Sequence, residues 1–235
     1  MFTINPFAVL SETIPSIFLQ SFVIVMIGLI VVGTVMDMIH KKNVKYFFNN
    51  AKKAKKSATR ELGAGERVSI IAKTVVYDIG TTSELGAGKR RVAHLLGMYG
   101  TILFWIASVV MIFFYSSTSS STPYLWPILW HAGASMTVLG GAWFWFFLRV
   151  DVYSEAKPWY RIIQADLFVL ALIATSLFGL IWSYLQSLNL EGRWDDKVFL
   201  VLYIFSNLVL FGGVYWSKFA HMFYKPGAAI QKNLA

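Results

Sequence analysis

The stretch Ile17–Ile39, IFLQSFVIVMIGLIVVGTVMDMI, is apolar over nearly its whole length. A bilayer core of about 30 Å is crossed by roughly 20 helical residues, so this stretch predicts a membrane-spanning helix. Four more stretches have the same character, and they are His94–Ser116, Leu125–Leu148, Ile163–Leu185 and Val198–Trp216. The pattern predicts an all-α membrane protein, a bundle of five transmembrane helices.

The composition agrees with this fold class. Apolar residue types make up 57% of the 235 residues and charged types 14%, with a mean hydropathy of +0.58, which is outside the usual range of soluble domains. There is no cysteine, so this chain by itself holds no disulfide, no iron–sulfur cluster and no catalytic thiol. No basic residue precedes the first apolar stretch, which therefore predicts a retained helix rather than a signal peptide.

The basic residues predict the orientation of the bundle. Lys41–Arg91 contains 13 Lys and Arg, Arg149–Arg161 contains 3, and the tail after Trp216 contains 3, whereas the opposite side has only Arg193 and Lys197. Because cytoplasmic loops carry the excess of Lys and Arg, we expect an outer N-terminus, a cytoplasmic C-terminus and a place in the cell membrane. The expected parts are a first helix (1–40), a basic cytoplasmic loop (41–92), a four-helix core (93–222) and a cytoplasmic tail (223–235).

The basic loop raises the question of its partner. Its run KKNVKYFFNNAKKAKK and the net charge of +9 would suit nucleic acid, but juxtamembrane lysines ordinarily set topology or contact anionic lipid. We therefore expect membrane lipids and no nucleic acid as partners. Further along the loop, Arg67–Ile79 alternates polar and apolar residues, which predicts a surface helix that lies on the membrane or against another protein.

The four histidines are distributed unevenly across the predicted depth of the membrane. His94 and His221 both lie at the cytoplasmic end, on different helices, and His40 at the same border suits an interfacial anchor. Histidine in or beside a bilayer is costly without compensation, and two imidazoles can ligate one haem iron from opposite faces. We expect His94 and His221 to be the axial ligands of one haem b. Gly97 and Gly100 would give the macrocycle room, and Arg91 and Lys218 would meet its propionates.

Three segments resemble a known family. KRRVAHLLGMYGTILFW, DLFVLALIATSLFGLIW and YWSKFAHMFYKPGAA are similar to segments of the membrane cytochrome b subunits of heterodisulfide reductase, quinone-interacting oxidoreductase and respiratory nitrate reductase. The resemblance covers roughly Tyr77 to Ala229. It implies a five-helix bundle, His94 and His221 as ligands of the haem nearest the cytoplasm, and electron transfer between quinone and a cytoplasmic iron–sulfur partner.

The resemblance also raises the question of a second, outer haem. Its ligand positions would fall at Ala107 and Tyr203, neither of which is a histidine, so we expect a single haem. His131, in the outer half, is left with three roles: an unusual haem ligand, a quinone and proton site, or a polar contact between helices. Tyr203 belongs to the same possible quinone or proton site, and so does Asp166, which could instead pair with Arg161.

These observations lead to one expected function and two alternatives. The expected function is a haem b-containing subunit that transfers electrons between the quinone pool and a cytoplasmic iron–sulfur or catalytic subunit. The alternatives are a haem-free membrane anchor for a catalytic subunit and a small transporter or channel subunit. The sequence offers no catalytic residue of its own for any of them.

Overall fold

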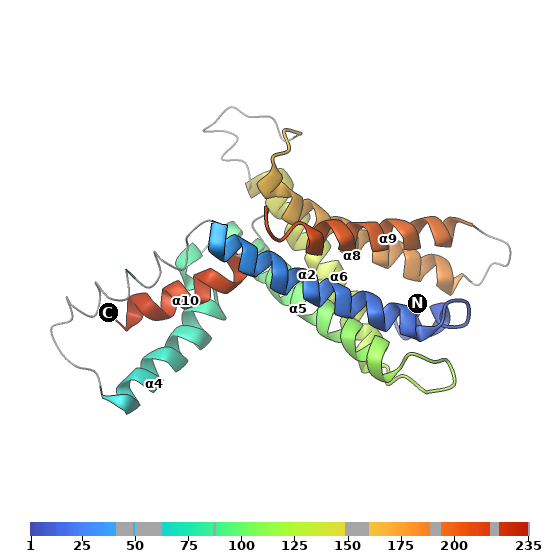
Figure 1. Cartoon of the computed structure of the whole chain (residues 1–235), viewed down its shortest axis with the longest axis horizontal. Helices are drawn as coiled ribbons and strands as arrows, with labels where there is room; N and C mark the ends of the chain where they lie inside the picture. The colour runs from blue at the N-terminus through green and yellow to red at the C-terminus, as the bar shows by residue number, and fades with distance from the viewer. Residues whose placement is uncertain are drawn as a thin grey trace.

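Helices form every regular element in the computed structural model, which describes residues 1–40, 49, 63–86, 88–148, 160–188, 194–216 and 221–234 (Figure 1). The five apolar stretches each contain a long helix, and these helices are α2 (Ser16–His40), α5 (Lys89–Phe114), α6 (Leu125–Trp143), α8 (Leu167–Ser187) and α9 (Asp195–Gly212). The π-helical turn η3 (Phe144–Leu148) extends α6, and the short 3-10 turn η4 (Gln164–Asp166) precedes α8. The all-helical class predicted from the sequence is confirmed for these residues.

Three of the helices, α2, α5 and α8, are long and apolar enough to cross a membrane. The other two are more polar for reasons visible in their sequences. The first turn of α9 carries Asp195, Asp196 and Lys197, and α6 contains His131 together with several glycines and tryptophans. Large apolar side chains on the outside of the long helices are exposed, among them Phe18, Leu139 and Val201. An apolar outer surface of this kind is suited to lipid rather than to water.

The helix ends differ from the predicted spans because charged residues outside the apolar core also take helical conformation. α5 begins at Lys89, several residues before the apolar stretch, and α9 begins at Asp195. Asp195 and Asp196 lie in the first turn of α9, where negative charge is favoured by the helix dipole. α9 ends at Gly212, earlier than predicted from hydropathy, and the backbone N–H of Gly213 closes that end on the carbonyl of Val209.

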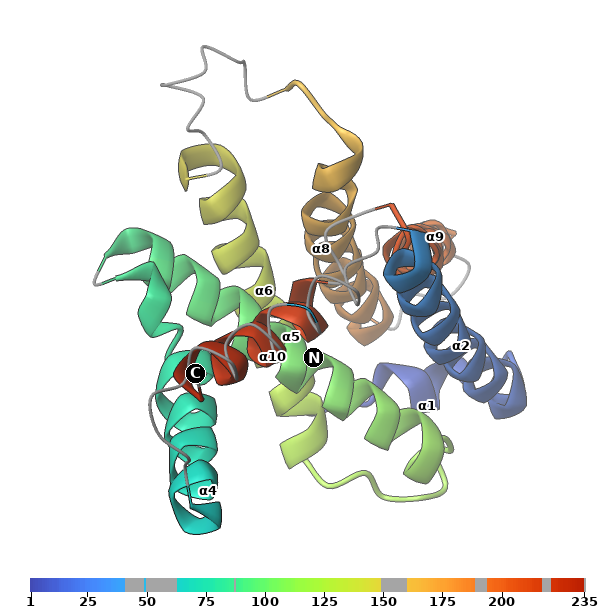
Figure 2. The ribbon, with the colours of Figure 1, turned by 60° about the vertical axis from the view of Figure 1, so that its left-hand side comes forward.

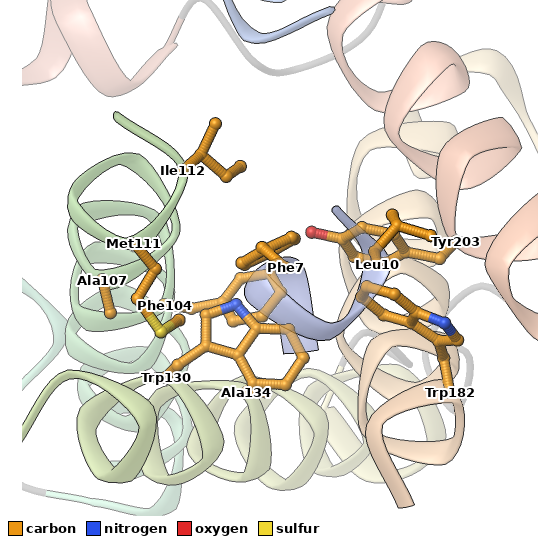
Figure 3. Close-up of a cluster of buried hydrophobic side chains, with 10 residues drawn as sticks. All are labelled: Phe7, Leu10, Phe104, Ala107, Met111, Ile112, Trp130, Ala134, Trp182 and Tyr203. Atoms are coloured by element: carbon orange, nitrogen blue, oxygen red, sulfur yellow. The ribbon is translucent and has the colours of Figure 1, made fainter. Parts of the chain in front are cut away.

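The core of the bundle is aromatic. Figure 3 shows its largest cluster, in which Trp130 of α6 and Trp182 of α8 meet Phe7 of the short helix α1 (Pro6–Leu10). The ring of Phe7 lies 5.8 Å from each of the two indoles, almost perpendicular to that of Trp130. The side chain of Asn5 caps α1 by accepting hydrogen bonds from the backbone N–H groups of Phe7 and Ala8. The N-terminal segment therefore closes this end of the bundle.

A second group of helices lies at the other end of the bundle. α4 (Ala64–Lys73) continues into the π-helical turns of η1 (Thr74–Ile79), and α10 (His221–Asn233) packs on both of them. Figures 1 and 2 show this group projecting from the bundle at the end where α5 begins. Arg67–Ile79, for which the sequence predicts a surface helix, is helical in this group, and its position at a membrane surface stays a prediction. The 3-10 turn η2 (Ser83–Leu85) connects it toward α5.

Candidate functional site

His94 lies in the second turn of α5, and its side chain is exposed. Gly97 follows one helical turn later, on the same side of the helix. A Cβ built on Gly97 would meet no atom within 4 Å, so there is free space along the Cβ direction of this residue, while its backbone nitrogen faces Gly140 of α6. A flat macrocycle could approach the backbone of α5 at this position, and this half of the predicted haem site fits the group.

Arg91 lies one turn before His94 and is half-buried. Its Nε–H donates a hydrogen bond to the carbonyl of Thr81 over 2.7 Å, and the hydroxyl of Tyr99 donates to the carbonyl of Gly80, also over 2.7 Å. These two bonds fasten the end of η1 to the first turns of α5. The guanidinium uses one of its five N–H donors in this contact.

His221, the second predicted ligand, is the first residue of α10. Val214 packs on Gly33 of α2, and the ring of Tyr215 lies 5.7 Å from that of His40, so the chain after α9 lies against the C-terminal end of α2. α10 begins at His221, at that end of the bundle (Figure 1). The side chain of His221 and all of Lys218 lie outside the described residues.

Gly100 does not share the open surface of Gly97. A Cβ on Gly100 would lie 2.7 Å from both the carbonyl oxygen of Gly133 and the backbone nitrogen of Thr137, so Gly100 faces α6. Gly140 of α6 approaches the backbone of Gly97 in the same way. Small residues allow two helix backbones to come this close in a membrane. The role of Gly100 is therefore in helix packing, in contrast to the predicted haem pocket.

His131 is completely buried in α6, and both of its ring nitrogens are within hydrogen-bond distance of protein groups. Nδ1 lies 2.7 Å from the carbonyl oxygen of Pro127, and Nε2 lies 2.8 Å from the hydroxyl of Ser183 on α8. Because a carbonyl only accepts, Nδ1 carries the proton, and the Nε2 of the neutral ring then accepts from Ser183. Of the three roles left open by the sequence, this geometry matches the polar contact between helices.

Tyr203 lies in the aromatic core. Its ring stacks on Trp182 with centroids 5.7 Å apart and an interplanar angle of 19° (Figure 3). Ala107, the other expected position of an outer ligand, is fully buried in the same cluster. The two positions are thus surrounded by packed side chains.

Asp166 is buried at the start of α8, where its carboxylate accepts a hydrogen bond of 3.0 Å from the backbone N–H of Ile163. This contact belongs to a capping box, in which the side chain at the third helical position accepts from the backbone N–H of the N-cap residue, here Ile163. The carboxylate therefore has a structural task in the turn that precedes α8.

A second carboxylate was not singled out from the sequence. Asp37 lies near the end of α2 and is only 1% exposed. A single acidic residue inside an otherwise uncharged span was the available signal, because such residues are rare and commonly functional in membranes. Gly33, one turn earlier, packs on Val214, so Asp37 lies on the side of α2 that approaches the end of α9.

The described residues contain no group of three or more His, Cys, Asp or Glu side chains that could hold a metal ion. A haem iron needs only two axial side chains, so the predicted pair remains to be tested by experiment. Comparisons with models of protein families, with curated proteins and with solved structures give no match. The resemblance to membrane cytochrome b subunits stays a prediction from the three quoted segments.

Proposed function

We propose that this chain is the haem b-containing membrane subunit of a respiratory oxidoreductase complex, built on five spans with the C-terminus in the cytoplasm. His94 and His221 hold the haem, which supplies one-electron transfer when bound. The chain passes electrons between membrane quinone and a cytoplasmic iron–sulfur partner. The observation that carries the proposal is the open surface of α5, where His94 is exposed beside a glycine whose Cβ would meet nothing.

Each residue of the proposed site has a task that its own chemistry suits. His94 ligates from α5, and His221 does so from the first residue of α10, at the same end of the bundle. Arg91, fastened to the loop by Thr81, supplies positive charge for the propionates. Gly97 keeps the adjacent surface flat. The iron–sulfur cluster belongs to a partner because this chain has no cysteine to ligate one.

The proposal places one haem at the inner end. Support for a single haem comes from the outer half, where Ala107 and Tyr203 are packed among aromatic side chains. Quinone reacts beside the inner haem in this scheme. At His131 a quinone carbonyl would have to displace the hydroxyl of Ser183 and would need a proton on Nε2.

A reduced-minus-oxidised spectrum of the chain purified from its native membrane, with a pyridine haemochrome assay, tests the proposal. We expect one haem b per chain, and loss of it in His94→Ala and in His221→Ala. His40→Ala is the matched control, because His40 lies at the same end and contacts Tyr215. A wild-type protein without a Soret band would support the haem-free anchor instead, and retention of haem in either variant would remove that histidine from the site.

A further inference from the structure

The helix formed by α4 and η1 presents an apolar stripe that nothing among the described residues covers. Val68, Ile71 and Val75 are spaced three and four residues apart, so they share one face, and Val76 widens it. Val68 is 66% exposed and Val76 is 71% exposed. The stripe is aliphatic and contains no aromatic residue.

The other side of the same helix is occupied. Thr74 is buried, and the side-chain amide of Asn233 on α10 donates hydrogen bonds to the Thr74 hydroxyl over 2.9 Å and to the Asp78 carboxylate over 2.8 Å. Ile70, one turn before Thr74, is half-buried on this side. Because α10 packs on the face of Thr74, the face of Val68 and Val75 is directed away from it.

The attachment of η1 to α5 determines the depth of the α4–η1 helix relative to the membrane. Gly80 and Thr81, directly after η1, accept hydrogen bonds from Tyr99 and Arg91 in the first turns of a helix long and apolar enough to cross a membrane. The end of η1 therefore lies at the level where α5 enters the bilayer. Figures 1 and 2 show α4 standing apart from the long helices of the bundle.

The charged residues beside the stripe indicate that it contacts the lipid bilayer. Arg67 borders it on one side and Lys73 lies beyond Val76 on the other, and both are exposed. Long basic side chains can reach the headgroups while an aliphatic stripe lies at the acyl boundary. The interfaces of protein partners are, in contrast, enriched in aromatic anchors, which this stripe lacks.

We propose that α4 and η1 lie in the inner surface of the bilayer, with Val68, Ile71, Val75 and Val76 at the acyl boundary and Arg67 and Lys73 among anionic headgroups. This helix is then an interfacial anchor, and it lies parallel to the membrane plane at the cytoplasmic end of the subunit. α10, bonded to the opposite face through Asn233, is thereby held on the cytoplasmic side. This inference does not depend on haem and applies equally to a haem-free anchor.

The absence of cysteine from the chain allows single-cysteine labelling without background. Val68→Cys and Val76→Cys report the stripe, Glu66→Cys reports the opposite, polar side of α4, and Leu139→Cys on α6 is the lipid reference because it is 63% exposed on a span. Each full-length variant carries a nitroxide label in nanodiscs of phosphatidylcholine, with or without one quarter phosphatidylglycerol. Power saturation then compares access of oxygen with access of a water-soluble nickel chelate.

In the anionic nanodiscs we expect the labels at Val68 and Val76 to be accessible to oxygen and shielded from nickel, as at Leu139, and the label at Glu66 to be accessible to nickel. Without anionic lipid, or with Arg67→Gln and Lys73→Gln together, shielding of the stripe should fall. Equal nickel access at Val68, Val76 and Glu66 would overturn the proposal. So would shielding from both reagents, which indicates a protein contact, and shielding independent of anionic lipid would overturn the role of the two cations.

Discussion

The Nε2 of His131 on α6 lies 2.8 Å from the hydroxyl of Ser183 on α8, and both side chains are buried inside the bundle. Because Nδ1 is bonded to Pro127, removing the hydroxyl leaves the ring with one unpaired nitrogen. We expect Ser183→Ala to lower the free energy of unfolding by about 1 kcal/mol, the usual scale of a hydrogen bond between membrane helices. Unfolding in mixed micelles measures it.

A double-mutant cycle with His131→Phe isolates this pair. If the hydrogen bond stabilises the contact of α6 with α8, Ser183→Ala should cost little once the imidazole is absent. Equal costs in the two backgrounds would contradict this explanation. Loss of quinone turnover from Ser183→Ala with unchanged stability would return His131 to the quinone site.

Two glycines on α5 should respond oppositely to the same substitution. A Cβ on Gly100 would meet backbone atoms of α6 at 2.7 Å, whereas one on Gly97 would meet nothing within 4 Å. We expect Gly100→Ala to cost about 1–3 kcal/mol of stability by forcing the helices apart, as overpacking usually does. Gly97→Ala should leave thermal stability unchanged or slightly raised, and larger residues there should reduce haem content. Thermal unfolding and haem content per chain, measured on the same samples, separate the two effects.

The aromatic core predicts a large cost for truncation at one tryptophan. Trp182 is 1% exposed, contacts Phe7 and stacks on Tyr203, so Trp182→Ala leaves a cavity between α1, α8 and α9. We expect a loss of about 3 kcal/mol or more in the free energy of unfolding. Trp194→Ala is the control, since Trp194 is 73% exposed. Similar losses in the two variants would argue against the described core.

The proposed orientation predicts where introduced cysteines react. Ser120, between α5 and α6, should lie outside, and Tyr160, before α8, should lie inside, and both residues are exposed. In intact cells a membrane-impermeant maleimide should label Ser120→Cys, and Tyr160→Cys only after permeabilisation. The reverse pattern would invert the bundle, and labelling of both positions in intact cells would contradict the number of spans.

The attachment of α10 to η1 depends on Asn233, whose amide donates to Asp78 over 2.8 Å. In Asn233→Asp two carboxylates would occupy this contact and repel each other at neutral pH. We expect faster amide hydrogen exchange throughout α10, with Asn233→Ala giving a smaller increase. Asp78→Asn combined with Asn233→Asp restores a donor and acceptor pair and should slow the exchange again. Unchanged exchange in Asn233→Asp would show that apolar packing alone holds α10.

Much of the architecture could be predicted from composition and hydropathy. Apolar stretches of bilayer length can satisfy their backbone groups in lipid only as helices, so helix formation from Ser16 to His40 follows from the local sequence. A surface segment in Arg67–Ile79 was expected from its mixture of polar and apolar residues, and the structure shows that its exposed apolar side chains share one face of a helix. The exact ends were not, because Lys89 and Asp195 extend their helices beyond the apolar core.

The candidate site could also be predicted only in part from the sequence. Residue type and predicted depth selected His94 as a candidate, and the structure shows it exposed in the second turn of α5. They could not distinguish Gly97 from Gly100, since two glycines one turn apart look alike until the neighbouring helix is positioned. They also left the role of His131 open, because its partner Ser183 is 52 residues away in the chain. Asp37 was missed although its isolation in an apolar span was visible.

The sequence by itself determined the helical class, the candidate spans and the chemistry available at each depth, because lipid leaves the backbone few alternatives and each side chain carries its own polarity. The tertiary structure alone decided which face of each helix is occupied. That choice depends on close approach between distant segments, such as Gly100 against Gly133 or Trp182 against Tyr203, and contacts of this kind are properties of packed pairs rather than of either residue.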